Sequence, residues 1–168
     1  AILKAYAWIM MMGAEGLQET SEVAVMNNNY LVKKLLEVRG VTLPWVDKHS
    51  RRLQEARFSL EEMKEDTGVG IDDVNRRIVD FGIQKCFTSH EPWIVPEPFT
   101  PEPPESTPIE DLDRFVEVFR QISHEAYTDP AIVKRAPHNC AISKIDGTPS
   151  KDPKRWAMTW RAYIRKHK

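Results

Sequence analysis

Seven prolines fall between Pro92 and Pro108, and they constrain this chain more than any other feature of its sequence. A proline cannot donate a backbone hydrogen bond, and it restrains the residue before it to extended geometry. The segment therefore predicts extended backbone with little sheet pairing. Trp93 and Phe99 lie among the prolines, and such apolar side chains are costly to leave in water. We expect an ordered loop laid across the domain surface or a cleft.

Helical periodicity dominates the first part of the chain. Ala1–Met12 predicts the end of a buried helix, and apolar residues at helical spacing predict a second helix over 14–38 that Gly40 ends. Shorter elements follow. We expect, in chain order, extended segments Val41–Trp45 and Arg57–Leu60, a short helix or turn Glu61–Thr67, a helix capped at Asp72 or Asp73 that runs through Phe81, and a strand Ile83–Thr88.

Three later helices begin with a capping residue followed by a proline: Thr107-Pro108, Asp129-Pro130 and Asp152-Pro153. The first is expected to start with a capping box between Thr107 and Glu110 and to run to Tyr127. The last is expected over Pro153–Arg165. It is basic, and its aromatic residues recur at helical spacing, which favours packing against the domain over nucleic-acid binding.

This order of elements predicts an α/β domain with a small, mainly antiparallel sheet covered by helices. We divide the chain into helices over 1–38, a small α/β domain over 39–150 and a basic helix over 151–168 that packs on it. The sequence opens inside an apolar helical pattern with no capping residue before it. We therefore expect a fragment of a longer protein.

Composition and motifs exclude several classes of function. A net charge of −1 argues against a whole-surface polyanion binder, and the longest apolar stretch, Ala5–Gly13, is too short to cross a bilayer. The only two cysteines, Cys86 and Cys140, form no CxxC motif and no disulfide framework, so we expect a reducing compartment. No pair of histidines has metal-ligand spacing, so we expect no metal site. Glycine-rich phosphate motifs are absent, and the adjacent residues Ser89-His90-Glu91 cannot form a relay with one another. The residues alone predict no self-contained catalytic set.

Five segments together resemble one family. They are MGAEGL (Met12–Leu17), SEVAVMNNNYL (Ser21–Leu31), TGVGIDDVNRRIVDFG (Thr67–Gly82), WIVPEPFTPEPPES (Trp93–Ser106) and APHN (Ala136–Asn139). Their order and spacing are similar to those of glycine decarboxylase, the P-protein of the glycine cleavage system, in its two-subunit form. The resemblance covers nearly the whole chain and implies the C-terminal small domain of the second subunit, with the helix leading into it.

The family implies a fold-type-I pyridoxal-phosphate enzyme that decarboxylates glycine and passes the aminomethyl group to the lipoyl arm of the H-protein. No lysine of this chain matches the Schiff-base lysine, so the resemblance implies no catalytic residue here and no activity or cofactor binding by this chain alone. The implied partners are the first subunit, the lipoylated H-protein and glycine, without nucleic acid or membrane, and the implied location is cytoplasmic. A non-catalytic interaction module is the alternative.

The resemblance also implies residues that line the substrate channel. Glu102 and Glu105 match the two glutamates of the family's EPTES motif. The loop from Phe87 to Ser106, which includes Thr88 and His90, is expected to approach the channel.

Three further channel candidates come from other segments. His138 lies in the segment similar to the family's APHT, whereas Gln54 and Gln84 stand where the family has histidine. Glutamine keeps a hydrogen-bonding group but cannot take up a proton near neutral pH. These two departures leave open a divergent paralogue that acts on another amino acid.

Overall fold

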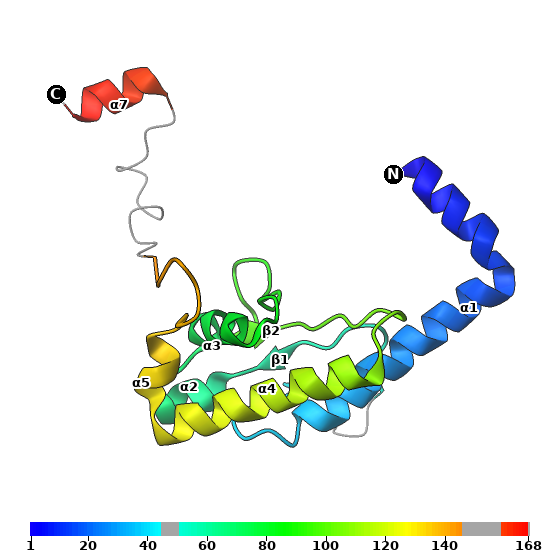
Figure 1. The fold of residues 1–168 in the computed structure, drawn as a ribbon, viewed down its shortest axis with the longest axis horizontal. Helices are drawn as coiled ribbons and strands as arrows, with labels where there is room; N and C mark the ends of the chain where they lie inside the picture. The colour runs from blue at the N-terminus through cyan, green and yellow to red at the C-terminus, as the bar shows by residue number, and fades with distance from the viewer. Residues whose placement is uncertain (45–50, 146–158, 168) are drawn as a thin grey trace.

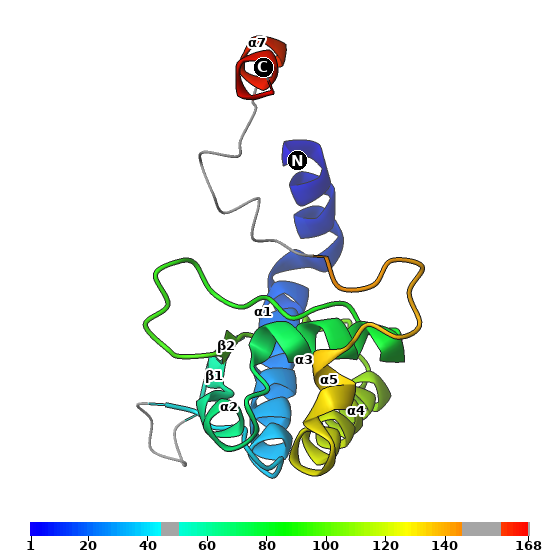
Figure 2. The same cartoon turned by 90° about the vertical axis from the view of Figure 1, so that its left-hand side faces the viewer.

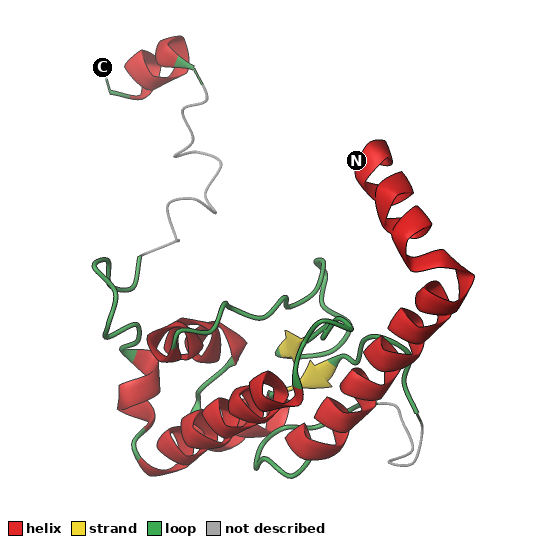
Figure 3. Ribbon diagram, turned by 45° about the vertical axis from the view of Figure 1, so that its right-hand side comes forward, coloured by secondary structure: helices red, strands yellow, loops and turns green. Residues whose placement is uncertain are grey.

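The computed structural model describes residues 1–44, 51–145 and 159–167, which are mainly helical (Figures 1 and 3). The helices are α1 (Ile2–Leu35), α2 (Glu61–Thr67), α3 (Ile71–Arg77), the 3-10 helix η1 (Ile78–Phe81), α4 (Ile109–Thr128), α5 (Pro130–Lys134) and α7 (Trp160–Lys166). The strands β1 (Phe58–Ser59) and β2 (Pro98–Phe99) form one antiparallel sheet. The predicted α/β class is therefore correct in the antiparallel sheet but overstates its size. None of the helices in this described part is long and apolar enough to cross a membrane.

Helix α1 consists of two halves joined at Gly13, whose φ of 64° and ψ of −176° are not helical. Glycine adopts such a backbone without steric cost. Figure 1 shows the first half, in dark blue, projecting away from the other helices. The helix predicted over 1–12 is confirmed, but its predicted burial is wrong. Because this half lies outside the packed part of the domain, Ile2 and Leu3 are 85% and 83% exposed.

The sheet is short because prolines and side-chain contacts replace much of its expected pairing. Its register pairs Phe58 with Phe99 and Ser59 with Pro98. The segment predicted as strand Ile83–Thr88 adds only one bridge, from Phe87 to Thr100. Asn75 takes the place of a strand neighbour there: its side chain accepts from the Cys86 amide at 2.8 Å and donates to the Cys86 carbonyl at 3.3 Å.

The core joins this sheet to α4. The Phe99 ring stacks on Phe58 at 5.0 Å and on Phe119 of α4 at 4.8 Å, between ring centroids, and all three side chains are buried. Buried aromatic pairs of this kind contribute about 0.5–1.5 kcal/mol beyond their area burial. The second half of α1 packs along α4, as Figures 1 and 2 both show. The helix predicted to run to Tyr127 is thus confirmed, and α4 ends at Thr128.

Two helix starts differ from the predicted caps. Helix α3 begins at Ile71 with Gly70 as its N-cap. The Glu97 carboxylate, far along the chain, accepts from the Ile71 amide at 2.7 Å. Asp73 accepts from the Gly70 amide at 3.3 Å instead of capping the helix itself. The capping box predicted at Thr107 does not form, and α4 begins at Ile109 without a side-chain cap. Asp129 caps α5 as predicted, accepting from the amide of Ala131 at 3.2 Å.

The C-terminal helix is described only in part. Asp152-Pro153 lies outside the described residues, and α7 begins after Thr159, whose side chain accepts from the Ala162 amide. Trp160 and Tyr163 stack with centroids 5.3 Å apart, and both stay exposed. Packing of this helix on the domain remains a prediction.

Candidate functional site

One hollow brings two of the predicted channel residues together. It has a volume of about 440 Å³ and takes wall residues from both halves of α1 and from two loops. Its walls include Trp8, Thr20, Ser21, Leu53, Gln54 and Glu105. Gln54 and Glu105, which come from segments far apart in the sequence, therefore share one surface.

Asn27 of α1 holds the Pro-rich loop beside this hollow. Its side-chain amide donates to the carbonyl of Pro104 at 2.9 Å and to that of Thr107 at 3.2 Å. Because these carbonyls flank Glu105 in the chain, a single buried side chain fixes the backbone that carries the glutamate.

The next two asparagines hold the loop that carries Gln54. Asn28 donates to the Leu53 carbonyl at 2.8 Å. Asn29 exchanges two hydrogen bonds with the backbone of Arg52, accepting from its amide at 2.9 Å and donating to its carbonyl at 2.7 Å. Buried backbone groups need such partners. The NNN sequence of α1 thus positions both walls of the hollow, a role that hydrophobic periodicity does not reveal.

A second, larger hollow of about 670 Å³ adjoins the first and shares Ser21 and Val25 with it. Lys33 and Arg51 lie in its wall beside Tyr30. The Tyr30 hydroxyl donates to the Asp113 carboxylate at 2.5 Å, and this hydrogen bond raises the pKa of the tyrosine. No residue of the sequence-based site prediction lines this hollow.

The other five predicted channel residues lie outside the walls of the first hollow: Gln84, Thr88, His90, Glu102 and His138. Four of them are exposed, and Thr88 is half-buried with its carbonyl accepting from the Thr100 hydroxyl at 3.2 Å. The structure thus groups Gln54 with Glu105 alone. A role in the channel for the remaining five stays a prediction.

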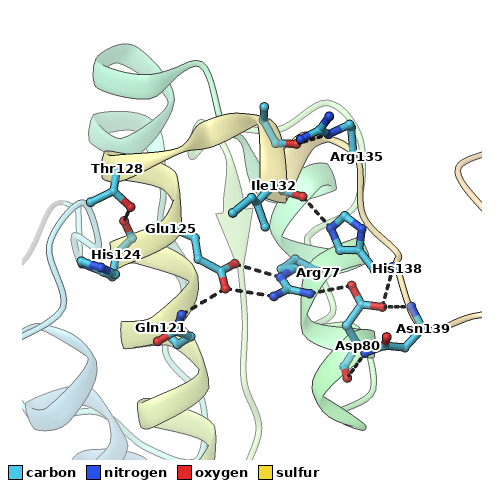
Figure 4. A network of polar contacts seen from close by, with 11 residues as sticks. Arg77, Asp80, Gln121, His124, Glu125, Thr128, Ile132, Arg135, His138 and Asn139 are labelled. Carbon is cyan, nitrogen blue, oxygen red and sulfur yellow. Dashed lines mark hydrogen bonds and ion pairs between the residues drawn. The ribbon is translucent and has the colours of Figure 1, made fainter.

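The backbone amide of His138 instead bonds to a buried ionic network formed by Arg77, Asp80 and Glu125 (Figure 4). The Arg77 guanidinium makes two hydrogen bonds to Glu125, at 2.8 and 2.9 Å, and one to Asp80 at 2.9 Å. Asp80 in turn accepts from the backbone amides of His138 at 2.7 Å and Asn139 at 2.8 Å. The network pins the APHN segment through its backbone and leaves the His138 ring exposed, with Nε2 at 2.8 Å from the Ile132 carbonyl.

The electrostatics of the network follow from its hydrogen bonds. Burial opposes ionisation of Asp80, but the Asn139 amide, the Arg77 guanidinium and the His138 amide together hold the pKa of Asp80 below its usual value. The hydrogen bond from Arg77 is the main cause that lowers the pKa of Glu125, against the opposing effect of burial. Both carboxylates are therefore stabilised as anions.

The match to known families covers most of this chain. The family described as "Glycine dehydrogenase, C-terminal domain" matches residues 20–139, a span that includes the three asparagines, both loops of the hollow and the Arg77 network. The chain belongs to this family. The sequence-based recognition is thereby confirmed.

Individual relatives of this chain are described as glycine dehydrogenase subunits, in agreement with the family match. The chain is 45% identical over 162 residues to the probable glycine dehydrogenase (decarboxylating) subunit 2 of Pyrococcus horikoshii, covering 96% of this chain and 31% of that protein. It is 37% identical over 145 residues to the probable subunit 2 of Thermotoga maritima, covering 86% of this chain and 29% of that protein. The chain thus spans about a third of the length of the curated relatives it matches.

A solved structure supports the fold. The crystal structure of glycine decarboxylase (P-protein) of the glycine cleavage system, in inhibitor-bound form, superposes with a TM-score of 0.56 at 23% identity. The match covers 68% of this chain and 24% of that chain. It shows that the small helical domain with its two-stranded sheet is shared.

The first hollow does not fit pyridoxal phosphate. The cofactor needs an amine for its aldehyde and hydrogen-bond donors for its phosphate. Within the described residues, no lysine or arginine lines the wall at Gln54 and Glu105. Over 1–44, 51–145 and 159–167, no group of three or more His, Cys, Asp or Glu side chains could hold a metal ion. The arrangement can bind and orient a molecule but contains no paired nucleophile and base.

Proposed function

We propose that this chain forms the C-terminal part of subunit 2 of a glycine dehydrogenase (decarboxylating), and that the hollow at Gln54 and Glu105 is part of its substrate-channel wall. The observation that carries the proposal is the family match over 20–139, which spans both loops and the asparagines that hold them. The chain's own contribution is to shape the channel and to exclude water from it.

In the assembled enzyme, the reaction is decarboxylation of glycine, with transfer of the aminomethyl group to the lipoyl arm of the H-protein. Pyridoxal phosphate, held by residues outside this chain, supplies the electron sink for that chemistry when it is bound. The partners in this proposal are the first subunit and the lipoylated H-protein, and the location is the cytoplasm. The chain by itself is inactive, because none of its residues matches the Schiff-base lysine.

The exposed half of α1 supports assembly with further chain. Its apolar side chains Ile2, Leu3, Tyr6, Met10 and Met11 are all largely exposed. Contiguous apolar surface on a helix marks an interaction site. Since the matched region makes up only 31% of the Pyrococcus horikoshii relative, we assign the face to contact with the rest of subunit 2.

The test compares this chain with the complete subunit 2 that contains it, each supplied with subunit 1, lipoylated H-protein and pyridoxal phosphate. Release of labelled CO2 from carboxyl-labelled glycine is measured. We expect release only with the complete subunit. If the complete enzyme ignores glycine but decarboxylates another amino acid, the divergent-paralogue alternative is correct. If it folds and decarboxylates none, the interaction-module alternative replaces the proposal.

A further inference from the structure

The hydroxyl groups on the wall of the first hollow use their hydrogens within α1. The Thr20 hydroxyl donates to the Leu17 carbonyl at 3.0 Å, and the Ser21 hydroxyl donates to the same carbonyl at 2.9 Å. A hydroxyl that has donated its one hydrogen keeps lone pairs that accept. Both oxygens are therefore acceptors toward any molecule in the hollow.

The remaining polar and aromatic walls point to the same kind of ligand. Glu105 adds a carboxylate, whose oxygens accept hydrogen bonds, and Gln54 adds an amide that accepts through its oxygen and donates through its NH2 group. Trp8, which is 44% exposed, forms an aromatic wall. Indole faces attract cations through their quadrupole. Acceptors, one negative charge and an aromatic ring together favour a positively charged hydrogen-bond donor.

The distribution of cations on this side of α1 sharpens the assignment. Lys33 and Arg51 line the adjoining hollow, whereas the described wall of the first hollow carries neither lysine nor arginine. An anionic group placed beside Glu105 would find no counter-charge there and would be repelled by it. The described wall of the first hollow therefore suits the cationic end of a ligand and not an anionic end.

We infer that the first hollow binds an alkylammonium group. The ammonium pairs with Glu105 and donates to Thr20 and Ser21, while its alkyl chain lies against Trp8 and the apolar wall. A volume of about 440 Å³ is enough for such a ligand. The ammonium belongs to a free small amine or to a lysine side chain of a partner. The inference stands on residues of this chain alone and goes beyond the proposed function.

The test is an NMR titration of the isotopically labelled chain with n-butylammonium chloride, with 1-butanol as the neutral comparison. The indole N–H of Trp8, assigned with Trp8→Phe, and the side-chain amide of Gln54 are followed. We expect saturable shifts with the ammonium that the alcohol does not reproduce. Glu105→Gln should weaken binding by about threefold to fivefold, as for a solvent-exposed ion pair. The control Glu19→Gln removes a carboxylate beside Thr20 that does not line the hollow, and it should leave the affinity unchanged.

A second arm separates the two sources of the ammonium. If Nα-acetyl-lysine N-methylamide binds more tightly than butylammonium, the ammonium belongs to a lysine of a partner. If the lysine derivative does not bind, the ammonium belongs to a free amine. The inference is overturned if the shifts do not saturate, if 1-butanol reproduces them, or if Glu105→Gln binds like the unchanged chain. Since the titration involves no turnover of glycine, its failure is distinct from failure of the proposed function.

Discussion

Replacing Asp80 with asparagine tests how firmly the ionic network holds the APHN segment. The Asp80 side chain is 1% exposed, and its carboxylate accepts from two backbone amides and from the Arg77 guanidinium. In Asp80→Asn, one oxygen still accepts from the amides of His138 and Asn139. The new NH2 group, however, faces the guanidinium, so a donor opposes a donor.

The expected loss of stability depends on which hydrogen bonds Arg77 keeps in Asp80→Asn. A buried ion left without any partner costs about 3–5 kcal/mol, but Arg77 retains both hydrogen bonds to Glu125. A single hydrogen bond to a charged group contributes about 1.5–3 kcal/mol. We therefore expect the free energy of unfolding to fall by about 2 kcal/mol, which lowers the Tm of a chain of this length by about 4–8 °C.

The assay is urea unfolding followed by circular dichroism, together with hydrogen exchange of the His138 and Asn139 amides. Asp80→Asn should lower the free energy of unfolding and speed exchange at both amides. Asp72→Asn removes an exposed carboxylate from the same helical region, and its cost should stay within about 0.5 kcal/mol. If Asp80→Asn costs no more than this control and both amides stay protected, the reasoning about the network is refuted.

Three further predictions concern stability. Asn27→Ala removes two hydrogen bonds to the Pro-rich loop and should cost about 1–3 kcal/mol, with faster proteolysis of that loop in limited digestion as the measurement. Gly40→Ala should cost more than Gly82→Ala in thermal unfolding. Both glycines have φ near +75°, but a Cβ at Gly40 would lie 2.8 Å from its nearest neighbours and one at Gly82 would lie 3.6 Å away. The depressed pKa values of Asp80 and Glu125 stabilise the fold above the unfolded carboxyl pKa values of about 4, and this stability is lost as pH falls through the lower folded values. The urea concentration at the midpoint of unfolding should therefore decrease as the pH falls below about 4. This decrease should be less steep in Asp80→Asn than in the unchanged chain.

Local rules explain which elements were predictable from the sequence. Helix α4 follows from apolar residues at helical spacing. Gly68 and Gly82 end α2 and η1 in the left-handed conformation, with φ of 73° and 75°. Such signals act within a few residues of the chain. The extended Pro-rich loop follows from proline chemistry in the same way.

Contacts between distant segments explain what was not predictable. Asn27 bonds to backbone carbonyls of the Pro-rich loop, and a carbonyl is present at every residue, so the sequence does not say which one is chosen. Glu97 replaces the expected cap of α3, and Asn75 replaces a strand neighbour of Cys86. Each depends on a fold that brings the partners together. The Arg77 network was not predictable for the same reason, because its partner Glu125 lies on another helix and is brought near only by the fold.

Glycine turnover by the complete two-subunit enzyme tests most directly whether the hollow at Glu105 lies on the path of the reaction. Subunit 2 carrying Glu105→Gln is compared with subunit 2 carrying Glu19→Gln, and CO2 release is measured over a range of glycine and H-protein concentrations. The account predicts that Glu105→Gln lowers kcat/KM by about tenfold, equivalent to about 1.4 kcal/mol, while Glu19→Gln stays within about twofold of the unchanged enzyme. Equal kcat/KM values for both variants, with the cofactor bound normally, would contradict it.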